Sequence, residues 1–92
     1  MDNTRYRTLD VEGLTVTVDT VKAGSWDAFK LLRKAREAST DLEQFDVLQE
    51  LVEFATDATE ERIVNHLGGK DAQMLDVVRI MSQIAAGCYP KN

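Results

Sequence analysis

The spacing of apolar residues changes once along this chain of 92 residues, and that change constrains its fold more than any other feature. Residues 14–18 read Leu-Thr-Val-Thr-Val, and this alternation of apolar and polar side chains is typical of a half-buried strand. Glu12-Gly13 has the composition of a turn, and residues 6–11 fit the first arm of a hairpin. From Ser25 onward the apolar residues recur every three or four positions, which is the period of a helix. We therefore expect a mainly α fold, in which a short N-terminal β-strand or hairpin precedes a bundle of about four helices.

The first two helices have clear starting signals. Ser25 is a good N-cap for a helix that ends before Ser39-Thr40. Thr40 and Glu43 have the spacing of a capping box, in which a hydroxyl and a carboxylate each accept a hydrogen bond from a free backbone N–H. The second helix should then continue to about Phe54.

The last two helices are bounded by acidic residues, threonine and glycine. Either Asp57 or Thr59 should cap a short third helix, which Gly68-Gly69 should end because glycine adopts the left-handed conformation at low cost. Asp71 should cap a fourth helix that ends at Gly87.

A chain of this length is expected to form one domain, residues 1–92. Within it we predict an N-terminal β element (1–21), a helical bundle (25–87) and a flexible tail (88–92). The composition, 43% hydrophobic and 29% charged, is that of an ordinary globular protein.

Charge and composition argue against several classes of partner. The formal net charge of -5 disfavours nucleic acid and anionic lipid, because both require a dense surface of Lys and Arg. No apolar run approaches the ~20 residues that span a membrane. The first residues are polar rather than leader-like, and a single cysteine, Cys88, cannot form an internal disulfide. We therefore expect a cytoplasmic protein that binds neither nucleic acid nor membrane.

The residues that commonly perform catalysis are sparse. His66 is the only histidine, and its place in the last turn of the third helix suggests a structural role near the helix dipole. Gly68-Gly69-Lys70 lacks the spacing of a phosphate-binding loop, and the acidic residues of 41–61 form no calcium-binding loop. We expect no catalytic residues, no cofactor and no metal site, and hence a protein that is not an enzyme.

The second and fourth helices carry more apolar surface than a small bundle needs. A surface helix usually presents a stripe a little wider than about 100°. Either one of these helices is central and packed on several sides, or its surplus face contacts a partner. The residues predicted to bind a partner are Phe45, Leu48, Leu51, Val52, Leu75, Ile80 and Met81. Trp26 and Phe29, by contrast, are expected to anchor the core between the first helix and the sheet.

Charge is divided unequally between segments. The first helix contains four cations against two acids, whereas the segment 41–61 is strongly acidic. The basic helix has three possible interpretations: a solvated face, a sparse nucleic-acid patch, or one side of a head-to-tail contact between copies. The cations are Lys30, Arg33, Lys34 and Arg36.

The order of these features resembles a known family. A β element ending in Leu14-Thr15-Val16-Thr17-Val18-Asp19 leads to a helix that opens with Ser25-Trp26-Asp27-Ala28-Phe29. An apolar helix, a short helix closed by Leu67-Gly68-Gly69, an amphipathic last helix and an end at Pro90-Lys91-Asn92 follow. In order, length and terminal sequence, nearly the whole chain is similar to the tail assembly chaperones of long-tailed bacteriophages and prophages.

The resemblance implies a protein that binds the tape measure protein, keeps it soluble, and helps to recruit the major tail (tube) protein. Such a chaperone acts in the cytoplasm of the bacterial host and is absent from the mature virion. The alternative is a small DNA-binding regulator in which the third and fourth helices form a helix-turn-helix. Its recognition helix would then contain Asp76 and a single cation, Arg79, which suits base contacts poorly.

Overall fold

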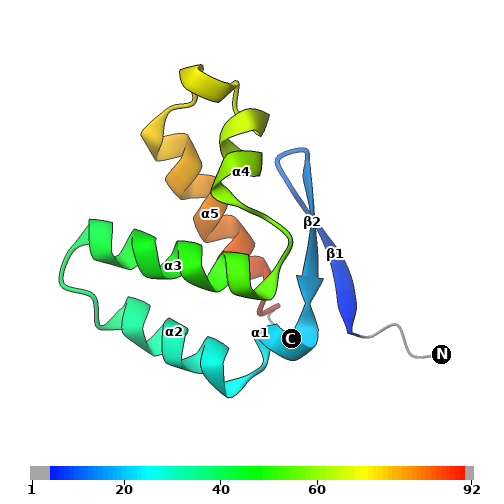
Figure 1. Ribbon diagram of the computed structural model, residues 1–92, viewed down its shortest axis with the longest axis vertical. Helices are drawn as coiled ribbons and strands as arrows, with labels where there is room; N and C mark the ends of the chain where they lie inside the picture. The colour runs from blue at the N-terminus through cyan, green and yellow to red at the C-terminus, as the bar shows by residue number, and fades with distance from the viewer. Residues whose placement is uncertain (1–4, 91–92) are drawn as a thin grey trace.

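The computed structural model describes residues 5–90, and in these residues a β-hairpin leads into a set of helices (Figure 1). The mainly α fold with an N-terminal hairpin is confirmed. The elements are β1 (Tyr6–Val11), β2 (Leu14–Asp19), α1 (Thr20–Ala23), α2 (Trp26–Arg36), α3 (Asp41–Ala55), α4 (Glu60–His66), the 3-10 turn η1 (Gly69–Asp71) and α5 (Met74–Gly87).

The two strands pair antiparallel, with Tyr6 opposite Asp19 and Val11 opposite Leu14. Glu12 and Gly13 connect them with φ angles of 52° and 88°. Two central residues with positive φ make the tight turn whose twist matches that of the flanking strands. One face of the hairpin is buried through Val11, Leu14, Val16 and Val18.

The predicted N-caps of the first two long helices are confirmed. The Ser25 hydroxyl accepts a hydrogen bond from the Ala28 N–H at 3.2 Å, at the start of α2. The Thr40 hydroxyl accepts one from the Glu43 N–H at 3.1 Å, at the start of α3. The Glu43 carboxylate accepts a bond from the Ser39 N–H at 3.1 Å, one residue earlier than in a standard capping box.

Thr59 rather than Asp57 caps α4, and Gly68 ends this helix in the left-handed conformation with φ 102°. The prediction that Asp71 caps the last helix is wrong, because Asp71 lies in η1. Gly69 also has a positive φ, 67°, so the turn continues past Gly68 before the chain reverses. As a result α5 begins two residues later than predicted, at Met74, with Gln73 at its N-cap and no side-chain cap.

The short helix α1 is a feature that the sequence patterns missed. Its N-cap is Asp19, whose carboxylate accepts hydrogen bonds from the N–H groups of Val21 and Lys22, both at 3.1 Å. Arg5 pairs with the same carboxylate at 3.1 Å, and this hydrogen bond is the main reason that the pKa of Asp19 lies below its ordinary value. One buried acid therefore ends β2 and starts α1.

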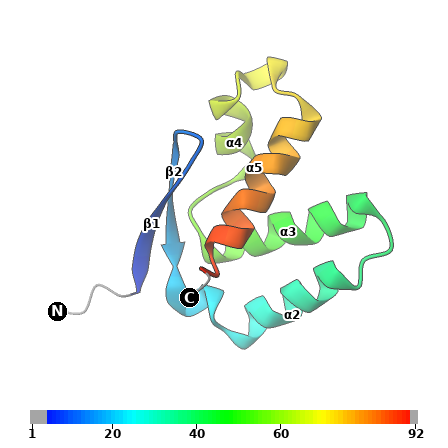
Figure 2. The same cartoon turned by 180° about the vertical axis from the view of Figure 1, so that it is seen from behind.

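The core forms where α5 passes between the hairpin and α3 (Figure 2). Its apolar cluster combines side chains from both strands, α3, α4 and α5. The largest fully buried side chains are Leu51, Val52, Ile63, Ile80, Met81, Ile84, Val16 and Val18. Of the two interpretations of the surplus apolar surface, the central position therefore accounts for the C-terminal half of α5.

The predicted flexible tail is wrong for its first two residues. Cys88 is only 5% exposed, and burial raises the pKa of its thiol. The Tyr89 hydroxyl donates a hydrogen bond to the Ala23 carbonyl at 2.7 Å, which fixes the chain beside α1. Residues 91 and 92 of the predicted tail, and residues 1–4 of the predicted β element, lie outside the described residues.

Gly87 is the point of closest approach between α5 and β1. A Cβ at this position would lie 2.4 Å from Cδ2 of Leu9. The substitution Gly87→Ala should therefore lower the free energy of unfolding by about 1–3 kcal/mol through overpacking, although alanine is favoured over glycine in a helix by up to about 1 kcal/mol. Urea unfolding of the variant and the wild type measures the difference.

The matched control is the same substitution in a Leu9→Ala background, where the space for the new methyl group exists. There Gly87→Ala should be neutral or stabilising. If Gly87→Ala stabilised the wild-type protein, β1 and α5 would not be in close contact at this point.

Candidate functional site

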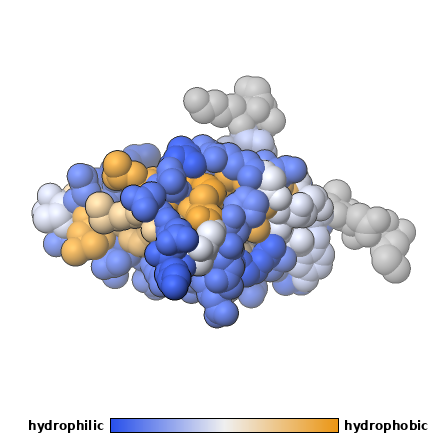
Figure 3. All heavy atoms as spheres, turned by 90° about the horizontal axis from the view of Figure 1, so that it is seen from above, coloured by the Kyte–Doolittle hydropathy of each residue, from blue (hydrophilic) through white to orange (hydrophobic). Residues whose placement is uncertain are grey.

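An apolar groove opens between the N-terminal halves of α3 and α5, with α4 at one side, and has a volume of about 730 Å³. From above, apolar side chains gather among hydrophilic ones on the left of the molecule, where α3 and α5 begin (Figure 3). The groove is lined by Asp41, Leu42, Gln44, Phe45, Leu48, Glu60, Val64, Met74, Leu75, Val77, Val78 and Ser82. A concave, mostly apolar surface of this size is typical of a binding site.

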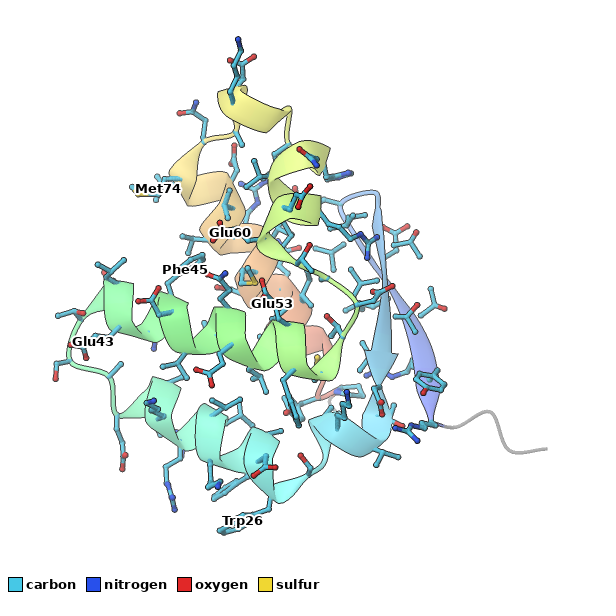
Figure 4. All side chains as sticks on the ribbon, viewed as in Figure 1. Trp26, Glu43, Phe45, Glu53, Glu60 and Met74 are labelled. Atoms are coloured by element: carbon cyan, nitrogen blue, oxygen red, sulfur yellow. The ribbon has the colours of Figure 1, made fainter. Side chains whose placement is uncertain are left out.

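The groove exists because α3 and α5 diverge toward their first turns. Phe45 and Leu48 are half-buried and pack against the core, so they form the inner part of the groove. Leu42, Met74 and Leu75 lie further out and are exposed, Leu75 to 73%. Phe45 projects from α3 toward α5, and Met74 lies across from it (Figure 4). Exposed apolar residues grouped in this way commonly mark a protein-binding surface.

The residues predicted to bind a partner divide into two groups. Phe45, Leu48 and Leu75 line the groove. The other four are fully buried core residues, so their assignment to a partner-binding surface is corrected. A side chain without exposed surface contacts no partner while the fold is intact. These four are Leu51, Val52, Ile80 and Met81.

Several groove residues were absent from that prediction. Leu42 and Met74 stand in the first turns of their helices, where the apolar period is only beginning. Val64 belongs to the short helix α4, for which only the bounds were predicted from the sequence. The wide apolar arcs of α3 and α5 in the sequence did indicate that these helices have more apolar surface than the core needs. They did not show which end of each helix has the exposed apolar residues.

The polar part of the groove is acidic. Asp41 and Glu60 line it, and no Lys or Arg does. Within residues 5–90 neither carboxylate takes part in a hydrogen bond or an ion pair with another side chain. The groove therefore combines apolar walls with uncompensated negative charge.

A second exposed apolar surface lies on α2, and it corrects the prediction that Trp26 and Phe29 anchor the core. Their rings stack with centroids 5.0 Å apart, and Trp26 is 66% exposed. The buried face of α2 is formed instead by Ala28 and Ala35, whose small side chains let α2 pack closely on α3. Trp26 points away from the body of the molecule (Figure 4).

Cations share this exposed surface with the aromatic rings. The Arg33 guanidinium lies 5.6 Å from the centroid of the Phe29 ring, which is a cation–π distance. We define the outer face of α2 as the exposed side opposite Ala28 and Ala35. Its exposed residues are Trp26, Asp27, Phe29, Lys30, Arg33, Lys34 and Arg36, and Asp27 pairs with Lys30 at 3.4 Å.

The exposure of Trp26 has a spectroscopic consequence. In dilute solution the fluorescence emission maximum of the native protein should lie close to that of the urea-unfolded protein, because the indole is in contact with water in both states. A native emission shifted strongly to the blue at the same dilution would place the indole in the core, as the sequence pattern suggested. Trp26 is the only tryptophan, so the signal is unambiguous.

The remaining charged groups on α5 have structural partners. Arg79 pairs with both carboxylate oxygens of Glu12 at 2.8 Å and with Asp76. The hydrogen bond from Arg79 is the main reason that the pKa of Glu12 is lowered. His66 Nε2 lies 2.9 Å from the Glu12 carbonyl oxygen. The hairpin turn is thereby held to α4 and α5, and the cation on which a DNA-recognition helix would depend is engaged within the fold.

In the part of the chain that the structure describes, no group of three or more His, Cys, Asp and Glu side chains could hold a metal ion. No helix in residues 5–90 has the length and apolar character needed to cross a membrane. No protein-family model, curated protein or solved structure matches the chain.

Proposed function

We propose that this protein is a tail assembly chaperone of a long-tailed phage or prophage, and that the groove between α3 and α5 holds apolar helical segments of the tape measure protein. The observation that carries the proposal is the set of exposed apolar residues along this groove, Leu42, Met74 and Leu75, beside half-buried Phe45 and Leu48. The resemblance of the chain to such chaperones adds the identity of the client.

The physical basis is the recognition of a helix by a groove. An amphipathic helix places residues from successive turns into an apolar groove, and the burial of their surface provides the affinity. A tape measure protein is long, helical and apolar, so its exposed stripes need cover until the major tail protein surrounds it. Several chaperones on one client would add avidity to individually modest contacts.

This activity belongs to the cytoplasm of the bacterial host, before the tail is complete. The chaperone then leaves, because tail tube subunits take over the surface that it covered. We accordingly place it outside the mature virion.

The test is co-expression with the tape measure protein, the proposed client. The soluble fraction of that protein should rise several-fold when the chaperone is present, and the two should purify together. If neither its solubility nor its co-purification depends on the chaperone, the proposal is wrong.

A further inference from the structure

We infer that, in the absence of a client, the groove is occupied by the outer face of α2 of a second copy of this chain. The inference rests on the proposed function only in treating the groove as a binding surface. It adds a partner, which is a second copy of this chain. It also adds a form of regulation, because an occupied groove cannot bind another ligand until the two copies separate.

The two surfaces match in chemistry. The groove offers apolar walls with two carboxylates and no cation, whereas the outer face of α2 offers two stacked aromatic rings and an excess of cations over its one acid, Asp27. Trp26 and Arg33 are of the residue types that most often dominate the affinity of protein interfaces, particularly when they enter an apolar pocket.

Both groove carboxylates and one cation of α2 are available for pairing, whereas Lys30 already pairs with Asp27 of its own helix at 3.4 Å. Within residues 5–90 the carboxylates of Asp41 and Glu60 have no ion-pair or side-chain hydrogen-bond partner, and neither does the guanidinium of Arg36. Most other exposed arginines of the fold, by contrast, are engaged: Arg5 with Asp19, Arg62 with Asp57 and Arg79 with Glu12. Opposite charges left unpaired on two apolar surfaces favour contact between those surfaces and fix its orientation.

The positions of the two surfaces determine the type of contact. Trp26 points away from α3 on one side of the molecule, whereas Phe45 and Met74 border the groove on the other side of α3 (Figure 4). One copy therefore contributes its groove and the other its α2, which is a heterologous, head-to-tail contact rather than the pairing of two identical patches.

Two variants separate the halves of this contact. Trp26→Asp/Phe29→Asp removes the aromatic rings and leaves the groove intact, and Leu75→Asp places a charge in the groove and leaves α2 intact. Both changes are at exposed positions, so the variants should fold, which circular dichroism checks. The control is Val21→Asp, an exposed apolar position on α1 outside both surfaces.

Analytical ultracentrifugation of the wild type should show self-association that weakens at least about tenfold between low and 0.5 M salt, because part of the attraction is electrostatic. Each of the two variants alone should be a monomer at concentrations where wild type and Val21→Asp associate. An equimolar mixture of the two should form a 1:1 heterodimer that does not grow further, since only one intact groove and one intact α2 face meet.

The outcomes are decisive in both directions. The inference is wrong if the wild type is monomeric at all accessible concentrations. It is also wrong if either variant alone still self-associates, or if the mixture of the two variants stays monomeric. The proposed function fails separately, because the Trp26→Asp/Phe29→Asp variant keeps the groove. If the inference alone is wrong, that variant still solubilises the client. If the proposed function alone is wrong, the heterodimer forms but no variant affects client solubility.

Discussion

Replacing Ile80 by alanine should lower the free energy of unfolding by about 2–5 kcal/mol, whereas replacing Leu75 by alanine should change it by less than about 0.5 kcal/mol. Both residues lie on α5, and both belong to the apolar face that the sequence presents as one surface. Ile80 is 0% exposed and packs in the core, whereas Leu75 is 73% exposed at the groove. Removing methyl groups from Ile80 leaves a cavity, but at Leu75 it only shortens a side chain in water.

Urea unfolding followed by far-ultraviolet circular dichroism measures both changes. A domain of this size is stable by roughly 5–14 kcal/mol, so Ile80→Ala should leave a visibly marginal protein. Similar losses for the two variants would mean that Leu75 is covered in the monomer, and the groove would then not exist as described.

If the proposed function is right, replacing Leu75 by aspartate should abolish the effect of the protein on its proposed client, the tape measure protein. The substitution puts a charge on a surface that an apolar helix must cover, where it would be desolvated without a cation. We expect affinity for the client to fall by at least about 30-fold, equivalent to about 2 kcal/mol. The soluble fraction of the co-expressed client should fall to its level without chaperone, while the chaperone itself stays folded.

Val21→Asp provides the comparison for this experiment. Val21 is 59% exposed on α1, so the same change in charge occurs on a different surface. This variant should solubilise the client as well as the wild type does. Equal loss of activity in both variants would point to net charge rather than to the groove.

The elements of this fold that could be predicted are those determined by neighbouring residues. The Glu12-Gly13 turn, the caps at Ser25 and Thr40 and the end of α4 at Gly68 all depend on local backbone chemistry, and all are present. The cap predicted at Asp71 is wrong because Gly69, like Gly68, has a positive φ and lengthens the turn. The identity of the residue at the cap position gives no information about the length of the turn before it.

The faces that each helix buries could not be predicted in the same way. On α2 the pair Ala28 and Ala35 faces α3, and the aromatic residues Trp26 and Phe29 face water. A sequence pattern ranks Trp and Phe above Ala as core residues, yet a close approach of two helices favours small side chains. The i, i+7 spacing of the two alanines was the signal that could have identified this face.

The groove illustrates the same limit. The apolar arcs of α3 and α5 predicted surplus surface correctly, but a periodic pattern gives no information about where two helices diverge. Their separation toward the first turns exposes Leu42 and Leu75 and leaves Leu51 and Ile80 buried. Only the tertiary arrangement distinguishes these pairs.

The central claim is that the groove between α3 and α5 is the client-binding surface, and nuclear magnetic resonance tests it most directly. The protein, labelled on its Leu, Val and Met methyl groups, is titrated with a soluble helical fragment of the tape measure protein, its proposed client. We predict that the largest chemical-shift changes occur at Leu42, Val64, Met74 and Leu75, which line the groove, while the methyl group of Val21 is unaffected. The claim would be contradicted if the signals of these four residues did not shift and the largest changes occurred at Leu31 and Leu32 on α2.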